Sequence, residues 1–159
     1  MIRPATGADR EAIAALHLAS WRSSYGIELP EDVLRDVLPD YLAAKWAERT
    51  FGEGQVTLLA EGAGGLSGFV CALTDRDPPL IDNLHVRPGL RGGGIGPGLL
   101  SAANAALAAR GFSRSTLTVL SRNTRAHAFY LANAGVDDGE EDDILVGKAV
   151  KVRRIGFAL

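Results

Sequence analysis

The chain has 159 residues, 47% of them hydrophobic and 23% charged, with a formal net charge of -2 at pH 7. This length and composition suit one globular domain with a real core, and the near-neutral charge provides no basic field for nucleic acid or an anionic membrane. The single cysteine, Cys71, excludes an internal disulfide. No signal peptide or membrane span is visible, so we expect a cytoplasmic protein that binds neither nucleic acid nor membrane.

Helical periodicity dominates the first third of the chain. Ile13, Leu16 and Leu18 give an Ala-rich segment a stripe that faces a core, and Leu42 and Trp46 do the same further on. Pro39 is expected to stop one helix before the next begins. The predicted elements are a strand over residues 1–4, a helix over 10–22, a short helix over 31–38 and a helix over 40–51.

Extended segments and helices alternate in the rest of the chain. The predicted elements are a hairpin of strands 55–61 and 66–73, a strand over 80–86, a glycine loop over 87–94, a helix over 95–109, a strand over 115–120, a helix over 123–134, and strands over 144–146 and 150–159. The strand–loop–helix–strand unit of residues 80–120 predicts a right-handed crossover and a parallel pair. Gly135 is expected to end the preceding helix in left-handed geometry. We predict one α/β domain over residues 1–159, with a mixed sheet.

A glycine-rich loop between a strand and a helix carries the clearest functional signal. Six glycines lie between Gly89 and Gly98. Without side chains the backbone can approach a ligand closely, and the unpaired amides at a helix N-terminus favour a phosphate or pyrophosphate. The dinucleotide-binding pattern fails because Pro97 or Leu99 takes its last glycine position, and Gly147-Lys148 lacks the earlier glycine of a Walker loop. A merely flexible turn is the alternative.

Two motifs together resemble the GNAT superfamily of acyl-coenzyme A-dependent N-acyltransferases. The stretch Arg91–Gly96 is similar to the superfamily's pyrophosphate loop, and Asn123-Thr124-Arg125-Ala126 followed by Tyr130 is similar to its Asn-x-x-Ala-x-x-x-Tyr helix. Val136 stands where phenylalanine is usual. The resemblance covers about the whole chain and implies a mixed sheet of about seven strands with about four helices. It also implies that the fourth and fifth strands splay apart, commonly at a bulge.

The resemblance further implies an N-acetyltransferase that uses acetyl-CoA, needs no metal and acts on a primary amine. The backbone of the fourth strand would meet the pantetheine arm and the thioester, the loop would hold the pyrophosphate, Asn123 would contact the arm, and Tyr130 would be the general acid that protonates the leaving thiolate. The implied cofactor-binding residues are Leu84, His85, Val86, Arg91, Gly92, Gly93, Gly94, Ile95, Gly96, Asn123 and Tyr130.

The residue that takes the proton from the amine is less defined. Asp82 is the nearest carboxylate, and strand alternation places it on the face of Leu84 and Val86 unless a bulge breaks the parity. A surface carboxylate or a water relay are the alternatives. His85 would point to the opposite face and be structural, and His17 is expected at a helix surface or edge.

Acceptor recognition is expected between the first two helices and in the loop over residues 74–79. Trp21, Tyr25 and Glu28 are the candidate substrate-binding residues, although Trp21 could equally be a core residue. The acidic run of residues 137–143 is expected to be a solvated loop, or else to attract a cationic acceptor. The sequence leaves open the amine, homodimer formation, and a second function, that of a coenzyme A-binding module without catalysis.

Overall fold

A mixed seven-stranded sheet organises the protein in the computed structural model, which describes residues 1–24 and 29–159. The strand order is β1-β2-β3-β4-β5-β7-β6. The strands are β1 (Ile2–Pro4), β2 (Gln55–Gly62), β3 (Gly65–Leu73), β4 (Leu80–Val86), β5 (Arg114–Leu120), β6 (Val136–Leu145) and β7 (Lys148–Ala158). All neighbours pair antiparallel except β4 and β5, which are parallel, as the crossover unit predicts.

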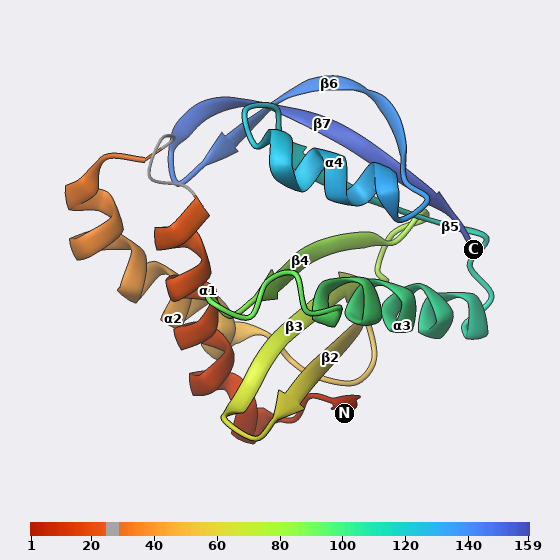
Figure 1. The fold of residues 1–159 in the computed structure, drawn as a ribbon, viewed down its shortest axis with the longest axis horizontal. Coiled ribbons are helices and arrows are strands. Elements are labelled where there is room, and N and C mark those ends of the chain that lie inside the picture. The colour runs from red at the N-terminus through yellow and green to blue at the C-terminus, as the bar shows by residue number, and fades with distance from the viewer. Residues whose placement is uncertain (25–28) are drawn as a thin grey trace.

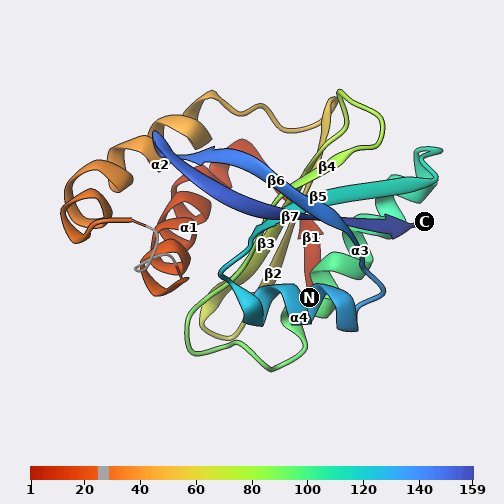
Figure 2. The ribbon, with the colours of Figure 1, turned by 90° about the horizontal axis from the view of Figure 1, so that it is seen from above.

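Two helices cover each face of the sheet (Figures 1 and 2). The helices are α1 (Arg10–Ser24), α2 (Leu38–Glu48), α3 (Ile95–Ala109) and α4 (Thr124–Ala132), with a 3-10 turn η1 (Gly7–Asp9) and a π-helical turn η2 (Val33–Val37). Successive strand residues point to opposite faces, so β3 supplies both cores. Phe69 and Cys71 pack with α1 and α2, whereas Val70 and Ala72 pack with α3.

A bulge in β4 accompanies the separation of the two halves of the sheet. Cys71 pairs with Asn83 but the next residue, Ala72, pairs with Ile81, so Asp82 is the extra residue. Only Leu80 of β4 pairs with β5, at Thr116, in the described part of the chain. Figure 1 shows β4 and β5 close at one end and apart at the other. This confirms the predicted splay of the fourth and fifth strands.

Two local predictions are wrong. Pro39 does not stop a helix: it lies in the first turn of α2, where its missing amide hydrogen is not needed. Gly135 is not the left-handed residue, because Ala134 takes that role with φ 71°. Glycine is required at 135 for space, since a Cβ there would lie 2.6 Å from Ile155 Cγ2 and 2.7 Å from the Tyr130 carbonyl oxygen.

The acidic run predicted as a solvated loop lies instead in β6, at the edge of the sheet. Its carboxylates face basic residues of β7: Asp137 accepts two hydrogen bonds from Arg153 at 2.9 Å each, Glu141 pairs with Arg154, and Asp142 with Lys151. Opposite charges on neighbouring strands stabilise the pairing, and a charged edge strand resists further strand addition. These ion pairs already neutralise much of the charge that was considered for a cationic acceptor.

Candidate active site

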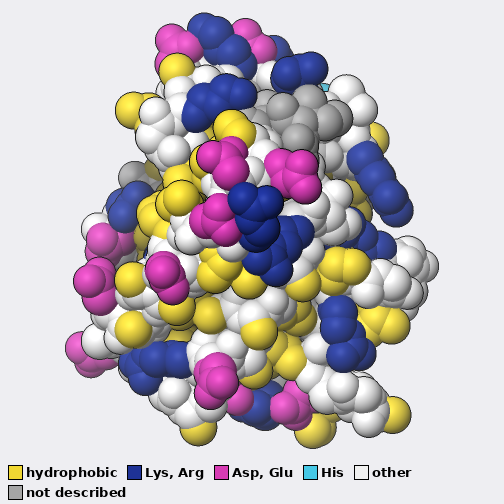
Figure 3. Space-filling model, turned by 90° about the vertical axis from the view of Figure 1, so that its left-hand side faces the viewer, with side chains coloured by type: hydrophobic (Ala, Val, Ile, Leu, Met, Phe, Trp, Pro, Cys, Tyr) yellow, Lys and Arg dark blue, Asp and Glu magenta, His cyan; other side chains and the backbone are white. Residues whose placement is uncertain are grey.

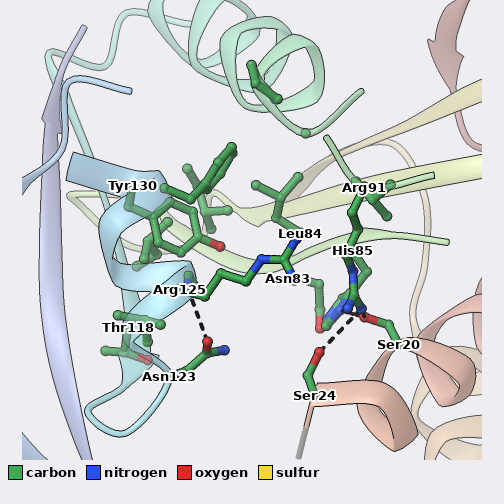
Figure 4. Close-up of a pocket in the computed structure, with 18 of the residues that line it drawn as sticks. Ser20, Ser24, Asn83, Leu84, His85, Arg91, Thr118, Asn123, Arg125 and Tyr130 are labelled. Atoms are coloured by element: carbon green, nitrogen blue, oxygen red, sulfur yellow. Dashed lines mark hydrogen bonds between the residues drawn. The ribbon is translucent and has the colours of Figure 1, made fainter. Parts of the chain in front are cut away.

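A cavity of about 490 Å³ lies where β4 and β5 separate. It is bounded by β4, the glycine loop, β5, one side of α4 and the C-terminal end of α1 (Figure 4). Segments far apart in the sequence therefore meet around one space. Of the predicted cofactor residues, Leu84, His85, Val86, Arg91, Gly92, Gly94, Gly96, Asn123 and Tyr130 line it.

The glycine loop reaches the cavity with alternate residues. Gly92 and Gly94 have φ values of 86° and 85°, which favour glycine, and Gly94 is the N-cap of α3. Gly96 lies close to α4: a Cβ at this position would come within 3.3 Å of Phe129 Cζ. Gly93 and Ile95, the other two predicted cofactor-binding residues of the loop, do not line the cavity but border a smaller groove beside Met1 and Ile2. Gly92, Gly94 and Gly96 nevertheless place the N-terminus of α3 at the wall of the cavity.

Arg91 connects the glycine loop to the end of α1. Its guanidinium donates to the hydroxyl of Ser23 at 3.1 Å and to those of Ser20 and Ser24 at 3.3 Å each. Burial, followed by the charge of Arg125, lowers the pKa of Arg91. Two cationic side chains therefore face one cavity, which suits an anionic ligand.

The sequence reasoning missed several of the residues that line the cavity, among them Arg125, Ser20 and Ser24. Arg125 extends from α4 across the cavity toward Leu84 (Figure 4), and no ion pair of its guanidinium is found within residues 1–24 and 29–159. A signal was available for each: Arg125 stands inside the Asn123 motif, and the serines recur at helical spacing, with Ser20, Ser23 and Ser24 on one face of α1.

Asn123 and Tyr130 come from the two ends of one helical motif. Asn123 caps α4, with its side-chain oxygen accepting from the Ala126 amide at 3.1 Å, so that its amide group remains available as a donor. The Tyr130 ring packs edge-on against Phe129 and Phe157, at centroid distances of 5.1 and 6.4 Å. These contacts fix the ring, and Figure 4 shows the phenol oxygen directed into the cavity.

Asp82 lines the cavity, but not on the face that strand alternation predicted. The bulge puts Asp82 on the α1/α2 face with Asn83, while Leu84 packs into the core under α3. Its Oδ2 lies 3.0 Å from Arg49 Nη2, 3.6 Å from Lys45 Nζ and 3.0 Å from Asn83 Nδ2. Burial raises the pKa of Asp82, but Lys45 and Arg49 outweigh it and hold the pKa below its usual value.

Two histidines stack between α1 and β4. His17 is fully buried, not at a helix surface as predicted, and its Nδ1 accepts from Trp46 Nε1 at 2.9 Å. Its ring centroid lies 4.5 Å from that of His85. His85 borders the cavity, and its Nδ1 lies 2.8 Å from the Ser20 hydroxyl. Burial, together with Arg91 and Lys45, lowers the pKa of His85 to about 3, against a smaller raising effect of Asp82.

Of the three predicted acceptor residues, Trp21 lies in the described part of the chain. Trp21 is 7% exposed and packs in a core with Leu38 and Leu42, so it is not a cavity residue. Tyr25 and Glu28 lie outside the described residues. The loop over residues 74–79 does not border the cavity. On the face that carries α1 and α2, basic and acidic side chains intermingle and neither sign dominates (Figure 3).

Within the described part of the chain, histidine, cysteine and carboxylate side chains form no cluster suited to a metal ion. None of the helices described there is long and apolar enough to cross a membrane.

A protein-family model and several solved structures resemble this chain. A family model described as the acetyltransferase (GNAT) family matches residues 11–136. A GCN5-related N-acetyltransferase from Rhodopseudomonas palustris has a similar structure, with 25% identity, a TM-score of 0.81, and coverage of 100% of this chain and 95% of that chain. A search of curated proteins finds no match.

Two further similar structures were solved with coenzyme A or acetyl-CoA. The PaiA N-acetyltransferase of Thermoplasma acidophilum, in complex with coenzyme A, has 17% identity and a TM-score of 0.79, covering 100% of this chain and 98% of that chain. YncA from Salmonella typhimurium, solved with acetyl-CoA, has 18% identity and a TM-score of 0.71, covering 99% of this chain and 92% of that chain. At these identities the likeness concerns the fold.

Proposed function

The chain belongs to the acetyltransferase (GNAT) family, and from this premise we propose that it transfers the acetyl group of acetyl-CoA to a primary amine. One observation supports this most directly. The glycine loop, the separated edge of β4, Asn123 and Tyr130 all border the same cavity. A phosphate site, a backbone edge and a proton donor are the three features that thioester binding and cleavage require.

The residues present suit coenzyme A. Gly92 and Gly94 leave open space where side chains would otherwise project, so a pyrophosphate can approach the amides at the α3 N-terminus. Arg91 and Arg125 supply positive charge beside them. The edge of β4 beyond Leu80 does not pair with β5 in the described structure, which leaves its backbone groups for the pantetheine arm.

The reaction has three tasks, and two of them fall to named parts of the chain. Backbone amides of the Leu84–Val86 segment would polarise the thioester carbonyl. Tyr130 would give its phenolic proton to the departing thiolate of coenzyme A. A third group must take a proton from the amine, because a lysine-like acceptor has a pKa of about 10 and is protonated at neutral pH.

A screen for amine-dependent thiol release tests the proposed activity. Acetyl-CoA is mixed with the protein and with an alanine-terminated peptide, lysine, spermidine, kanamycin or glycine, and the appearance of free thiol is followed. Release that depends on both the amine and the protein supports an N-acetyltransferase. Binding of coenzyme A without release for any amine supports instead a binding module without catalysis.

A substitution at the helix N-cap tests the proposed pyrophosphate site. We expect Gly94→Asp to weaken coenzyme A binding at least about tenfold, or about 1.4 kcal/mol. Aspartate tolerates the left-handed backbone of Gly94 and is a good N-cap, so the fold should persist. Its carboxylate should accept hydrogen bonds from the helix amides and repel the phosphates. Isothermal calorimetry measures the change.

Gly94→Asn is the matched control for that substitution. Its side chain has nearly the same shape and capping ability but no charge, so it should weaken binding clearly less. Equal affinities of the parent and both variants would show that the loop is structural and would contradict the pyrophosphate site.

A further inference from the structure

We propose that the imidazole of His85, and not the carboxylate of Asp82, accepts the proton of the amine. This inference rests on the proposed acetyltransferase function and assigns the one task left open there. The titratable side chains that border the cavity in the described structure are Asp82, His85, Arg91, Arg125 and Tyr130. Guanidinium groups cannot act as bases, and Tyr130 is assigned as the proton donor.

Asp82 is poorly placed to be the acceptor. Arg49, Lys45 and Asn83 all lie within 3.6 Å of its Oδ2. A proton arriving there would have to displace two cationic partners from a half-buried carboxylate. Its side chain therefore belongs to an ion-pair cluster with Lys45 and Arg49 at the border of the cavity.

His85 has one nitrogen engaged and one available. Nδ1 lies 2.8 Å from the Ser20 hydroxyl, which also accepts from Arg91 at 3.3 Å. When Nδ1 carries the hydrogen and donates it to Ser20, Nε2 holds a lone pair. No partner of Nε2 is found within the described chain. Ser20 thus orients the ring, and the tautomer in which Nδ1 donates to Ser20 is the one that leaves Nε2 to accept a proton.

The chain Arg91–Ser20–His85 couples this acceptor to cofactor binding. The charged and titratable groups around the imidazole are His17 from α1, Lys45 from α2, Asp82 from β4 and Arg91 from the loop. Arg91 is a cation that lowers the pKa of His85, and the pyrophosphate of bound coenzyme A would offset its charge. The ring therefore becomes a better base when the thioester is present.

The proton balance of the step is complete. The acceptor reacts as its neutral amine, after its ammonium form has lost one proton to solvent. The amine nitrogen bonds to the thioester carbon and gives its second proton to His85 Nε2. The carbon–sulfur bond breaks with its electron pair on sulfur, and the thiolate takes the proton of Tyr130. His85 then returns its proton to solvent, and Tyr130 regains one, so that both side chains end as they began. The products are the amide and the thiol of coenzyme A.

An NMR titration tests the coupling with coenzyme A alone. The His85 ring resonances are followed from pH 7.5 down to the onset of acid unfolding, without and with saturating coenzyme A. We expect the cofactor to raise the pKa of His85, so that protonation begins at a higher pH when it is bound. Shifts of the Gly92–Gly96 amides without a change in His85 would overturn this inference alone. No response of the loop amides would overturn the proposed cofactor site as well.

Turnover tests the catalytic role. With the best amine of the thiol-release screen, we expect His85→Gln to lower kcat by about 10²-fold or more while coenzyme A affinity stays within about threefold. Its kcat should also lose the acidic limb of the parent pH profile. His17→Gln is the matched control: it changes the other ring of the stack, retains an acceptor for Trp46, and should keep kcat within about threefold.

Asp82→Asn is the competing variant in the same experiment. If Asp82→Asn loses the activity and the acidic limb while His85→Gln keeps both, the base is Asp82 and the assignment to His85 is wrong. If His85→Gln does not fold, as circular dichroism would show, His85→Asn replaces it, and the NMR titration of the parent still decides the coupling.

Discussion

Tyr130→Phe should lower turnover by about 10²–10⁴-fold and leave coenzyme A affinity nearly unchanged. The phenol oxygen is directed into the cavity, whereas the ring packs against Phe129 and Phe157, contacts that phenylalanine preserves. The variant therefore removes a proton donor without removing a wall of the site. Single-turnover thiol release at saturating acetyl-CoA, with calorimetry of coenzyme A binding, measures both quantities.

Phe129→Leu is the matched control for this substitution. It alters the neighbouring ring, which contacts Gly96 of the loop, but removes no ionisable group. We expect it to affect coenzyme A binding more than turnover. A loss of turnover below about threefold in Tyr130→Phe would show that the thiolate leaves unprotonated or takes its proton from water, and the general-acid role would be refuted.

Local sequence patterns were sufficient to predict several residues that meet at the cavity. The glycine loop, the Asn123 cap and Tyr130 each depend on neighbours within one or two helical turns, so their spacing carries the geometry. The parallel crossover followed from element order. The predicted meeting of these residues at the separation of β4 and β5 agrees with the cavity in the structure.

The face of Asp82 could not be read from its own strand. Whether residue 82 shares a face with Leu84 depends on a bulge, which is defined by pairing with β3, a different segment. The acidic strand β6 failed for a related reason. Its charges on both faces are typical of a solvated loop, and only the partner strand, with Lys151, Arg153 and Arg154, explains why it is extended.

The buried state of His17 did have a signal in the sequence. His17 follows Ile13 by four residues and precedes Trp21 by four, so it lies on the same face of α1 as two core residues. The usual preference of histidine for intermediate exposure concealed this. Its partner, the indole of Trp46, comes from α2 and depends on how the two helices pack.

The His17–His85 stack should make the protein lose stability in weak acid. Burial, the neighbouring His85 and the cations Lys45 and Arg49 hold the pKa of His17 far below its usual range, and burial with Arg91 and Lys45 lowers that of His85 to about 3. In the unfolded chain both return to about 6.5. Their contribution is therefore fully present above about pH 6.5, and it falls with pH because only the unfolded chain binds the protons.

The expected loss is large compared with the stability of a small domain. Each neutral histidine can remove up to about 1.4 kcal/mol per pH unit below 6.5, so the two together can remove on the order of 5 kcal/mol by pH 4.5. Carboxylates affect stability at lower pH, since Arg3, by hydrogen bonding, lowers the pKa of Asp9 to about 2.

Urea unfolding at several pH values measures the slope of the unfolding free energy against pH. His17→Gln should reduce the slope between pH 6.5 and 4.5, because glutamine still accepts from Trp46 Nε1 but binds no proton. The same slope in the parent, in His17→Gln and in His85→Gln would show that other groups cause the acid sensitivity.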